Sequence, residues 1–322
     1  MKLPLSPDGV DSFERQIDDF GPWMHAYHLG DDIYTGYYKS QGLPRSLTWV
    51  TRSSATADIE RMREAYNRRR HDLWTEYVQS IFDRVCDKDC RSSLHLLDIG
   101  SASGLLSFRA VQDGFGRVTS SEIRPEQCAQ QRLLLDTLSN SKYRQRIAVV
   151  HDPVSADDPS FPERYLVDQP DIVCSFGLLY HLVNPFQHLV NLHRIAGRAA
   201  VVYSMTHYHP FAKGFWALGI EDAEWITKST SSISWTPHFL EVARLCRVVG
   251  FRRVTVVYPQ LFMRNFPEMV SGRSRWVDVK LAAAMALQRL TGVRIGHMRN
   301  FEPDYFRDST MNPNYAAYVC EK

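Results

Sequence analysis

The sequence predicts an open α/β fold, in which a mostly parallel β-sheet carries helices on both faces. Three observations support this fold class. Short apolar runs alternate with helical patterns along the chain, as is typical of parallel strands joined by crossover helices. A loop of small residues, 100–104, follows the first of these runs. An acidic residue, Glu122, ends the second run, 24 residues after Asp98.

The loop after the first strand is the most informative segment of the chain. The apolar run that begins at Leu96 ends in Asp98, and Gly100, Ser101 and Gly104 follow before a helical pattern begins. The spacing is D-x-G-x-x-x-G, which differs from the dinucleotide fingerprint and from the phosphate-binding P-loop, and the loop has no lysine to hold a phosphate. Glycine lets the backbone approach a ligand closely. We therefore expect a large, flat cofactor to lie against this loop.

The remaining elements follow in the order that such a sheet requires. After the first strand, the expected strands are 117–122, 147–150, 171–176, 199–204, 253–258 and 315–320, and the expected helices include 105–112, 125–138 and 185–195. Glu122 stands at the tip of the second strand. A carboxylate in that position accepts hydrogen bonds from both hydroxyls of a ribose, and its charge repels a 2′-phosphate.

A second motif, after the fourth expected strand, resembles a motif of a known protein family. The segment from Phe176 to Pro185 reads F-G-L-L-Y-H-L-V-N-P and lies between an expected strand and an expected helix. It resembles the class I S-adenosylmethionine (SAM)-dependent methyltransferases. It is most similar to the group that includes natural-product methyltransferases and wobble-uridine tRNA methyltransferase-like proteins. Segments 22–37 and 235–251 are similar to the same group.

The resemblance implies a fold, a cofactor and a set of residues that bind it. The fold is a Rossmann-like sheet of seven strands, and the cofactor is SAM. Asp152, after the third strand, stands where related enzymes often contact the adenine amino group. The residues expected to bind the cofactor are Asp98, Gly100, Ser101, Gly104, Glu122, Asp152 and Phe176.

The chain is longer than a minimal methyltransferase core, which predicts a cap and two insertions. We expect residues 1–75 to form an N-terminal cap through which substrate enters, and residues 76–322 to form the SAM-binding domain. Insertions 205–235 and 259–312 would form a lid over the carboxyl ends of the strands. Their aromatic and polar side chains predict a walled substrate pocket. The expected substrate contacts are Tyr180, Trp23, His25, Tyr37 and Trp216.

Histidines are the candidate catalytic residues. SAM carries an activated methyl group, so the protein has to align a nucleophile and remove its proton if that nucleophile is a hydroxyl. Histidine titrates near neutral pH and suits this role. His181 follows the fourth strand, and His207 and His209 follow the fifth. We expect the base among these three, with anchoring of its own loop as the alternative role of His181.

Composition and charge limit the other classes of function. The chain of 322 residues is 44% hydrophobic and has a formal net charge of +2, so its overall charge does not indicate nucleic-acid binding. Its six cysteines do not suggest a secreted disulfide framework. We recognise no signal peptide or membrane-spanning stretch, so we expect a cytoplasmic protein. Cys86 and Cys90 lack a second cysteine pair, and we expect no metal site. The oligomeric state is left open.

An arginine-rich helical pattern keeps RNA binding as an alternative. Five arginines lie within the pattern at 57–82, where they either face water or contact an RNA backbone. Three functions therefore remain. The aromatic cap and the near-neutral charge favour methylation of a hydroxyl oxygen on a small natural product or sugar-like metabolite. The alternatives are tRNA wobble-uridine modification by methyl or carboxymethyl transfer, and a catalytically inactive SAM-binding partner subunit.

Overall fold

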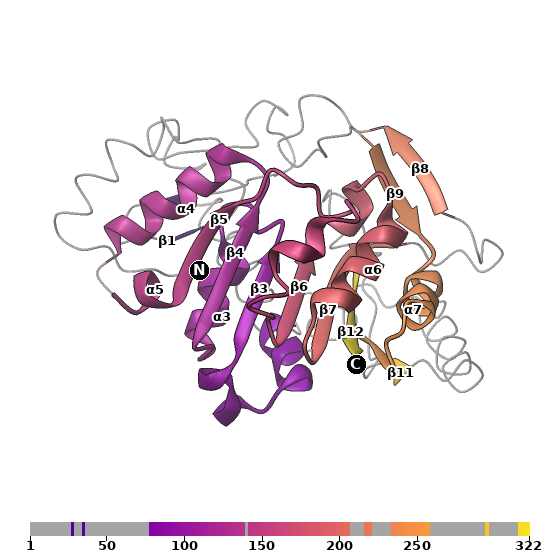
Figure 1. Ribbon diagram of the computed structural model, residues 1–322, viewed down its shortest axis with the longest axis horizontal. Coiled ribbons are helices and arrows are strands. Elements are labelled where there is room, and N and C mark those ends of the chain that lie inside the picture. The colour runs from indigo at the N-terminus through magenta and orange to yellow at the C-terminus, as the bar shows by residue number, and fades with distance from the viewer. Residues whose placement is uncertain are drawn as a thin grey trace, which may run out of the picture. The chain divides into compact units, whose positions relative to one another are not determined.

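The computed structural model describes residues 27–28, 34–35, 77–138, 141–206, 216–220, 233–257, 294–295 and 315–322 (Figure 1). The chain divides into two compact units. The first unit contains residues 1–79 and 86–155, and the second contains residues 80–85 and 156–322.

Three parallel strands form the centre of the first unit. They are β3 (His95–Ile99), β4 (Arg117–Glu122) and β5 (Ile147–His151), and Asp98 of β3 stands opposite Ser120 of β4. All five residues of β3 are buried, as expected for a strand inside a parallel sheet. The helices of this unit include α3 (Leu105–Gln112), α4 (Pro125–Thr137), α5 (Ser141–Arg146) and the 3₁₀ helix η3 (Lys88–Ser93). Two short strands, β1 (Tyr27–His28) and β2 (Tyr34–Thr35), pair antiparallel.

The second unit contains a mixed sheet. Strands β6 (Ile172–Phe176) and β7 (Ala199–Met205) are parallel, and β12 (Tyr315–Glu321) pairs antiparallel with β7 and with β10 (Arg253–Val257). The two-residue β11 (Arg294–Ile295) pairs with β10. Its helices include α6 (Pro185–Ile195), α7 (Phe239–Val248) and the 3₁₀ helices η4 (Phe161–Arg164) and η5 (Leu179–His181). A separate hairpin pairs β8 (Trp216–Ile220) with β9 (Ile233–Pro237).

The strand order confirms the predicted fold class. Hydrogen-bonded neighbours follow the order β3-β4-β5 in the first unit and β11-β10-β12-β7-β6 in the second. The seven expected strands are all present with mostly parallel pairing, and β11 adds an eighth strand that the sequence did not predict. Most observed bounds agree with the expected ones within one residue; α4, for example, ends at Thr137 rather than at residue 138.

The cap and the insertions lie largely outside the described residues. Of the expected cap, the structure describes β1 and β2. Of the expected lid, it describes β8, β11 and part of β9. The domain boundary at residue 75 and the lid therefore remain predictions. Within the described ranges, no helix has both the length and the apolar composition needed to cross a membrane.

Candidate cofactor site and acceptor residues

The loop between β3 and α3 has the backbone that its small residues permit. Gly100 and Gly104 have φ angles of 68° and 90°, in the left-handed region that glycine adopts without a steric penalty. Ala102 also has a positive φ, 49°, and it is the only described non-glycine residue that does. Because a Cβ atom disfavours this conformation, the surrounding contacts must hold Ala102 in place.

A buried carboxylate at the end of β4 holds the loop from one side. The Glu122 side chain is only 1% exposed. Its Oε2 atom accepts a hydrogen bond of 2.7 Å from the backbone N–H of Ala102. The Arg124 backbone N–H and Nε both donate to Oε1, at 3.1 and 2.8 Å, and Arg124 Nη2 donates to Oε2 at 3.3 Å. The predicted ribose acceptor is therefore a buried, ion-paired group in contact with the predicted cofactor loop.

A chain of buried side chains holds the loop from another side. The Ser107 hydroxyl donates to Asp98 Oδ2 at 2.7 Å, and its oxygen lies 2.9 Å from the Ser120 hydroxyl oxygen. Ser120 donates to Gln131 Oε1 at 2.6 Å. Gln131 Nε2 in turn donates to Ser101 Oγ at 2.9 Å and to the carbonyl oxygen of residue 102 at 2.6 Å. Asp98 is thereby connected to the loop through three side chains.

The environment of Asp98 changes its acidity. Burial raises its pKa from 3.8 to about 7, and the nearby charge of Glu122 acts in the same direction. The hydrogen bond from Ser107 opposes this shift because it favours the ionised form. Asp98 therefore changes its charge near neutral pH, two residues before the loop predicted to bind the cofactor.

Tyr27 and Gln131 contact the loop but were not among the predicted site residues. The Tyr27 hydroxyl donates to the carbonyl oxygen of Ser103 at 2.6 Å, and its ring packs edge-on against Phe108 with centroids 6.0 Å apart. Tyr27 is buried, so the N-terminal segment contributes directly to the loop. For Gln131 a usable signal existed, because it shares the buried face of α4 with Cys128 at helical spacing.

Asp152 supports the end of β4. Its backbone N–H donates to the carbonyl oxygen of Glu122 at 2.9 Å, and its Oδ1 atom accepts from the N–H of Val154 at 3.1 Å. Asp152 is buried, so its side chain fixes the turn that follows β5. In this unit, the structure places Asp98, Gly100, Ser101, Gly104, Glu122 and Asp152 at or just beyond the carboxyl ends of three adjacent parallel strands.

The second unit carries the predicted residues Phe176, Tyr180 and His181. Phe176 ends β6, and its ring stacks on Tyr203 with centroids 5.4 Å apart. The chain then turns at Gly177, which has a φ of 73° and donates its N–H to the carbonyl oxygen of Tyr203 at 2.8 Å. The rings of Tyr180 and His181 lie 4.1 Å apart on η5. The loop therefore holds a tyrosine and a histidine side by side at the carboxyl end of β6.

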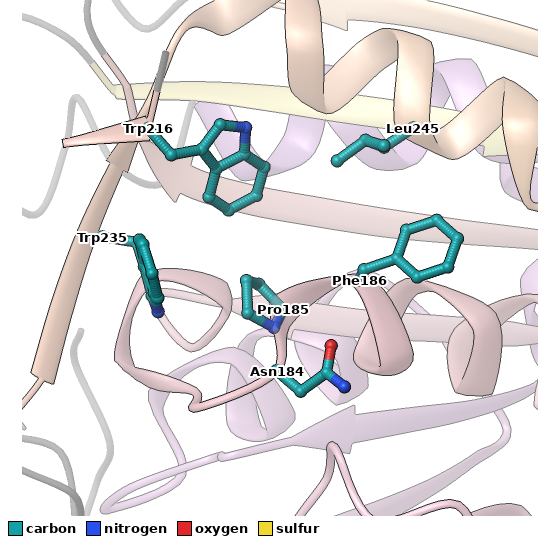
Figure 2. A pocket seen from close by; sticks show the side chains of 6 residues that line it. All are labelled: Asn184, Pro185, Phe186, Trp216, Trp235 and Leu245. Atoms are coloured by element: carbon teal, nitrogen blue, oxygen red, sulfur yellow. The ribbon is translucent and has the colours of Figure 1, made fainter. Parts of the chain in front are cut away.

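Trp216, the other predicted substrate contact in this unit, lines an apolar cavity. Figure 2 shows its side chain and that of Trp235 beside the first turn of α6. The cavity has a volume of about 240 Å³, and its lining residues are Asn184, Pro185, Phe186, Trp216, Trp235 and Leu245. The two indole rings meet nearly edge-to-face, with centroids 6.2 Å apart and an interplanar angle of 74°.

The polar atom of one indole is already used within the fold. Trp235 Nε1 donates to the carbonyl oxygen of Leu182 at 2.9 Å, which attaches hairpin β8–β9 to the loop that carries His181. Trp235 therefore offers the cavity an apolar ring with a fixed orientation. The cavity is open to solvent, and its apolar lining favours a small apolar or ring-shaped group.

Five predicted residues lie outside the described ranges. They are the candidate bases His207 and His209 and the substrate contacts Trp23, His25 and Tyr37. Within the described ranges, no group of three or more His, Cys, Asp or Glu side chains is arranged to hold a metal ion. Independence from metals therefore stays a prediction.

Comparison with known proteins identifies the fold. No family model matches the sequence, and no curated protein sequence matches it. The crystal structure of the N-terminal domain of EvdMO1, in the presence of SAH (S-adenosylhomocysteine) and D-fucose, is similar with a TM-score of 0.51 and 11% identity. The match covers 97% of this chain and 95% of that chain.

Two further solved structures match with lower scores. An S-adenosylmethionine-dependent methyltransferase from Mesorhizobium loti has a TM-score of 0.40 and 13% identity, over 71% of this chain and 91% of that one. The [4+2]-cyclase SpnF has a TM-score of 0.43 and 13% identity, over 100% and 98% of the two chains. The chain has a Rossmann-like α/β fold, which it shares with the EvdMO1 domain. A shared fold does not by itself define the reaction.

Proposed function

We propose that this protein is a SAM-dependent methyltransferase. The observation that carries the proposal is the buried Glu122 carboxylate, bonded to the strained glycine-containing loop at 100–104. Small side chains allow a flat ligand to approach such a backbone closely, and a carboxylate at the end of β4 suits ribose hydroxyls. Asp98, Gly100, Ser101, Gly104 and Glu122 would hold the cofactor, with Asp152 and Phe176 completing the set. When bound, SAM supplies an activated methyl group.

We further propose that the acceptor is a hydroxyl oxygen of a small natural product or sugar-like metabolite. His181, half-buried beside Tyr180, would remove the hydroxyl proton, with His207 and His209 as the other candidate bases. Tyr180 and Trp216 would position the acceptor, and the apolar cavity beside Trp216 favours a cyclic compound. The similar EvdMO1 domain was crystallised in the presence of D-fucose, which makes sugars the first acceptors to test. We expect the reaction in the cytoplasm.

The proposal is tested by methyl transfer from SAM labelled in its methyl group. One arm offers a panel of sugars, deoxysugars and hydroxylated natural products, and a second arm offers bulk tRNA at low and high salt. We expect label in a small molecule, with a loss of turnover in His181→Gln. Salt-sensitive labelling of tRNA would instead favour the RNA-modifying alternative, because phosphate contacts weaken as salt rises. Tight SAM binding without transfer to any acceptor would favour the inactive partner subunit.

A further inference from the structure

We propose that Arg124 is an internal occupant of the ribose position, and that it has to leave Glu122 when the cofactor binds. The inference rests on the proposed function. An ionised carboxylate offers about four acceptor positions. In this structure the Glu122 carboxylate accepts from Ala102 N, Arg124 N, Arg124 Nε and Arg124 Nη2. The two ribose hydroxyls would therefore find no acceptor position to use.

The four donors differ in how easily they can be exchanged. The N–H groups of Ala102 and Arg124 belong to the backbone, and they stay in place as long as the loop and the end of β4 keep their conformation. The other two donors belong to the Arg124 side chain, which is 25% exposed. Arg124 is the N-cap residue immediately before α4, so its side chain can turn toward solvent while β4 and α4 remain unchanged. Two exchangeable donors match the two hydroxyls of a ribose.

This exchange gives Arg124 two opposite effects. Without ligand, its guanidinium compensates the buried charge of Glu122, which would otherwise be costly. With ligand, breaking two charge-assisted hydrogen bonds subtracts from the affinity that the ribose gains at the same carboxylate. Replacing the guanidinium should therefore tighten the binding of ligands that carry both hydroxyls. Ligands without those hydroxyls should gain nothing.

The first experiment compares dissociation constants for S-adenosylhomocysteine, measured by calorimetry at pH 8 on the full chain. Arg124→Met keeps the length of the side chain and removes its donors. Arg132→Met, on the exposed part of α4, is the matched control for the loss of one arginine. We expect a dissociation constant about 3- to 10-fold lower for Arg124→Met, the value of one modest net hydrogen bond, and an unchanged one for Arg132→Met.

A second readout separates exchange at Glu122 from a general effect on folding. Adenosine and 2′,3′-dideoxyadenosine differ in the two hydroxyls, and their binding is compared by ligand-observed NMR. We expect Arg124→Met to strengthen adenosine binding and to leave the dideoxy compound unchanged. Arg124→Lys, which keeps the charge but offers a single ammonium, should lie between the parent and Arg124→Met.

Each outcome has a defined meaning. Equal or weaker S-adenosylhomocysteine binding by a folded Arg124→Met variant, with normal binding by the parent, overturns this inference and leaves the proposed function intact. An equal gain for both nucleosides also overturns it. Failure of the parent itself to bind S-adenosylhomocysteine overturns the proposed function, and this inference with it.

Discussion

Replacing Asp98 by Asn should change how the stability of the protein depends on pH. The folded state raises the pKa of Asp98 from 3.8 to about 7, mainly by burial. A carboxyl group with a raised pKa favours folding while it is protonated. Its contribution is complete below about pH 4 and is lost as pH rises through about 7. Asparagine has no such titration, and its amide oxygen can still accept from Ser107.

The magnitude follows from the size of the shift. Each pH unit between the unfolded and folded pKa values is worth about 1.4 kcal/mol. Between pH 5 and pH 7 the parent should therefore lose about 2 kcal/mol of unfolding free energy that the Asp98→Asn variant keeps. The variant gains relative to the parent over this interval, and the difference levels off above pH 7.

The assay is urea unfolding followed by circular dichroism at pH 5, 6, 7 and 8. Asp136→Asn, an exposed position on α4, controls for the removal of one negative charge from the same unit. Asp136→Asn should follow the parent across the range. Parallel pH profiles for the parent and Asp98→Asn would show that Asp98 titrates at an ordinary pKa, and that burial does not raise it.

Three further substitutions test the contacts of the loop. Glu122→Gln should weaken S-adenosylhomocysteine binding by about 1–3 kcal/mol in calorimetry, whereas the control Glu126→Gln, at an exposed position, should not. Equal affinities of the parent and Glu122→Gln would show that Glu122 is not part of the site. Ala102→Gly should raise the free energy of unfolding by up to about 1 kcal/mol, because glycine adopts the positive φ of this position without strain. The control Ala129→Gly, within α4, should lower the free energy of unfolding by a similar amount. If both variants have a lower free energy of unfolding than the parent, Ala102 is not strained. Tyr27→Phe should cost about 0.5–1.5 kcal/mol in urea unfolding by removing the bond to Ser103, and no cost would mean that water replaces it.

The sequence predicts the fold and the first layer of the cofactor site because both depend on local patterns. Alternating strands and helices place Asp98, Glu122 and Asp152 after three parallel strands, and the loop residues Gly100 and Gly104 have the backbone that glycine predicts. Strand ends and loop composition are visible in a single sequence.

The contacts that hold the loop could not be predicted in the same way. Tyr27 reaches Ser103 across 76 residues, and Gln131 reaches Ser101 across 30, so both contacts depend on packing between distant segments. The ion pair between Glu122 and Arg124 is local, but only its geometry reveals that it uses the acceptor positions of the carboxylate. The position of Trp216 also depends on the folded structure. The sequence suggests an aromatic contact, and only the register of β8 with β9 places Trp216 beside Trp235.

The most direct test of the central claim is a calorimetric titration of the full chain with S-adenosylhomocysteine at pH 8, with Glu122→Gln measured in parallel. We expect saturable binding to one site with a dissociation constant on the order of micromolar, and clearly weaker binding by the variant. Absence of binding at millimolar ligand, or identical binding by the parent and Glu122→Gln, would contradict the assignment of a cofactor site to the 100–104 loop and Glu122.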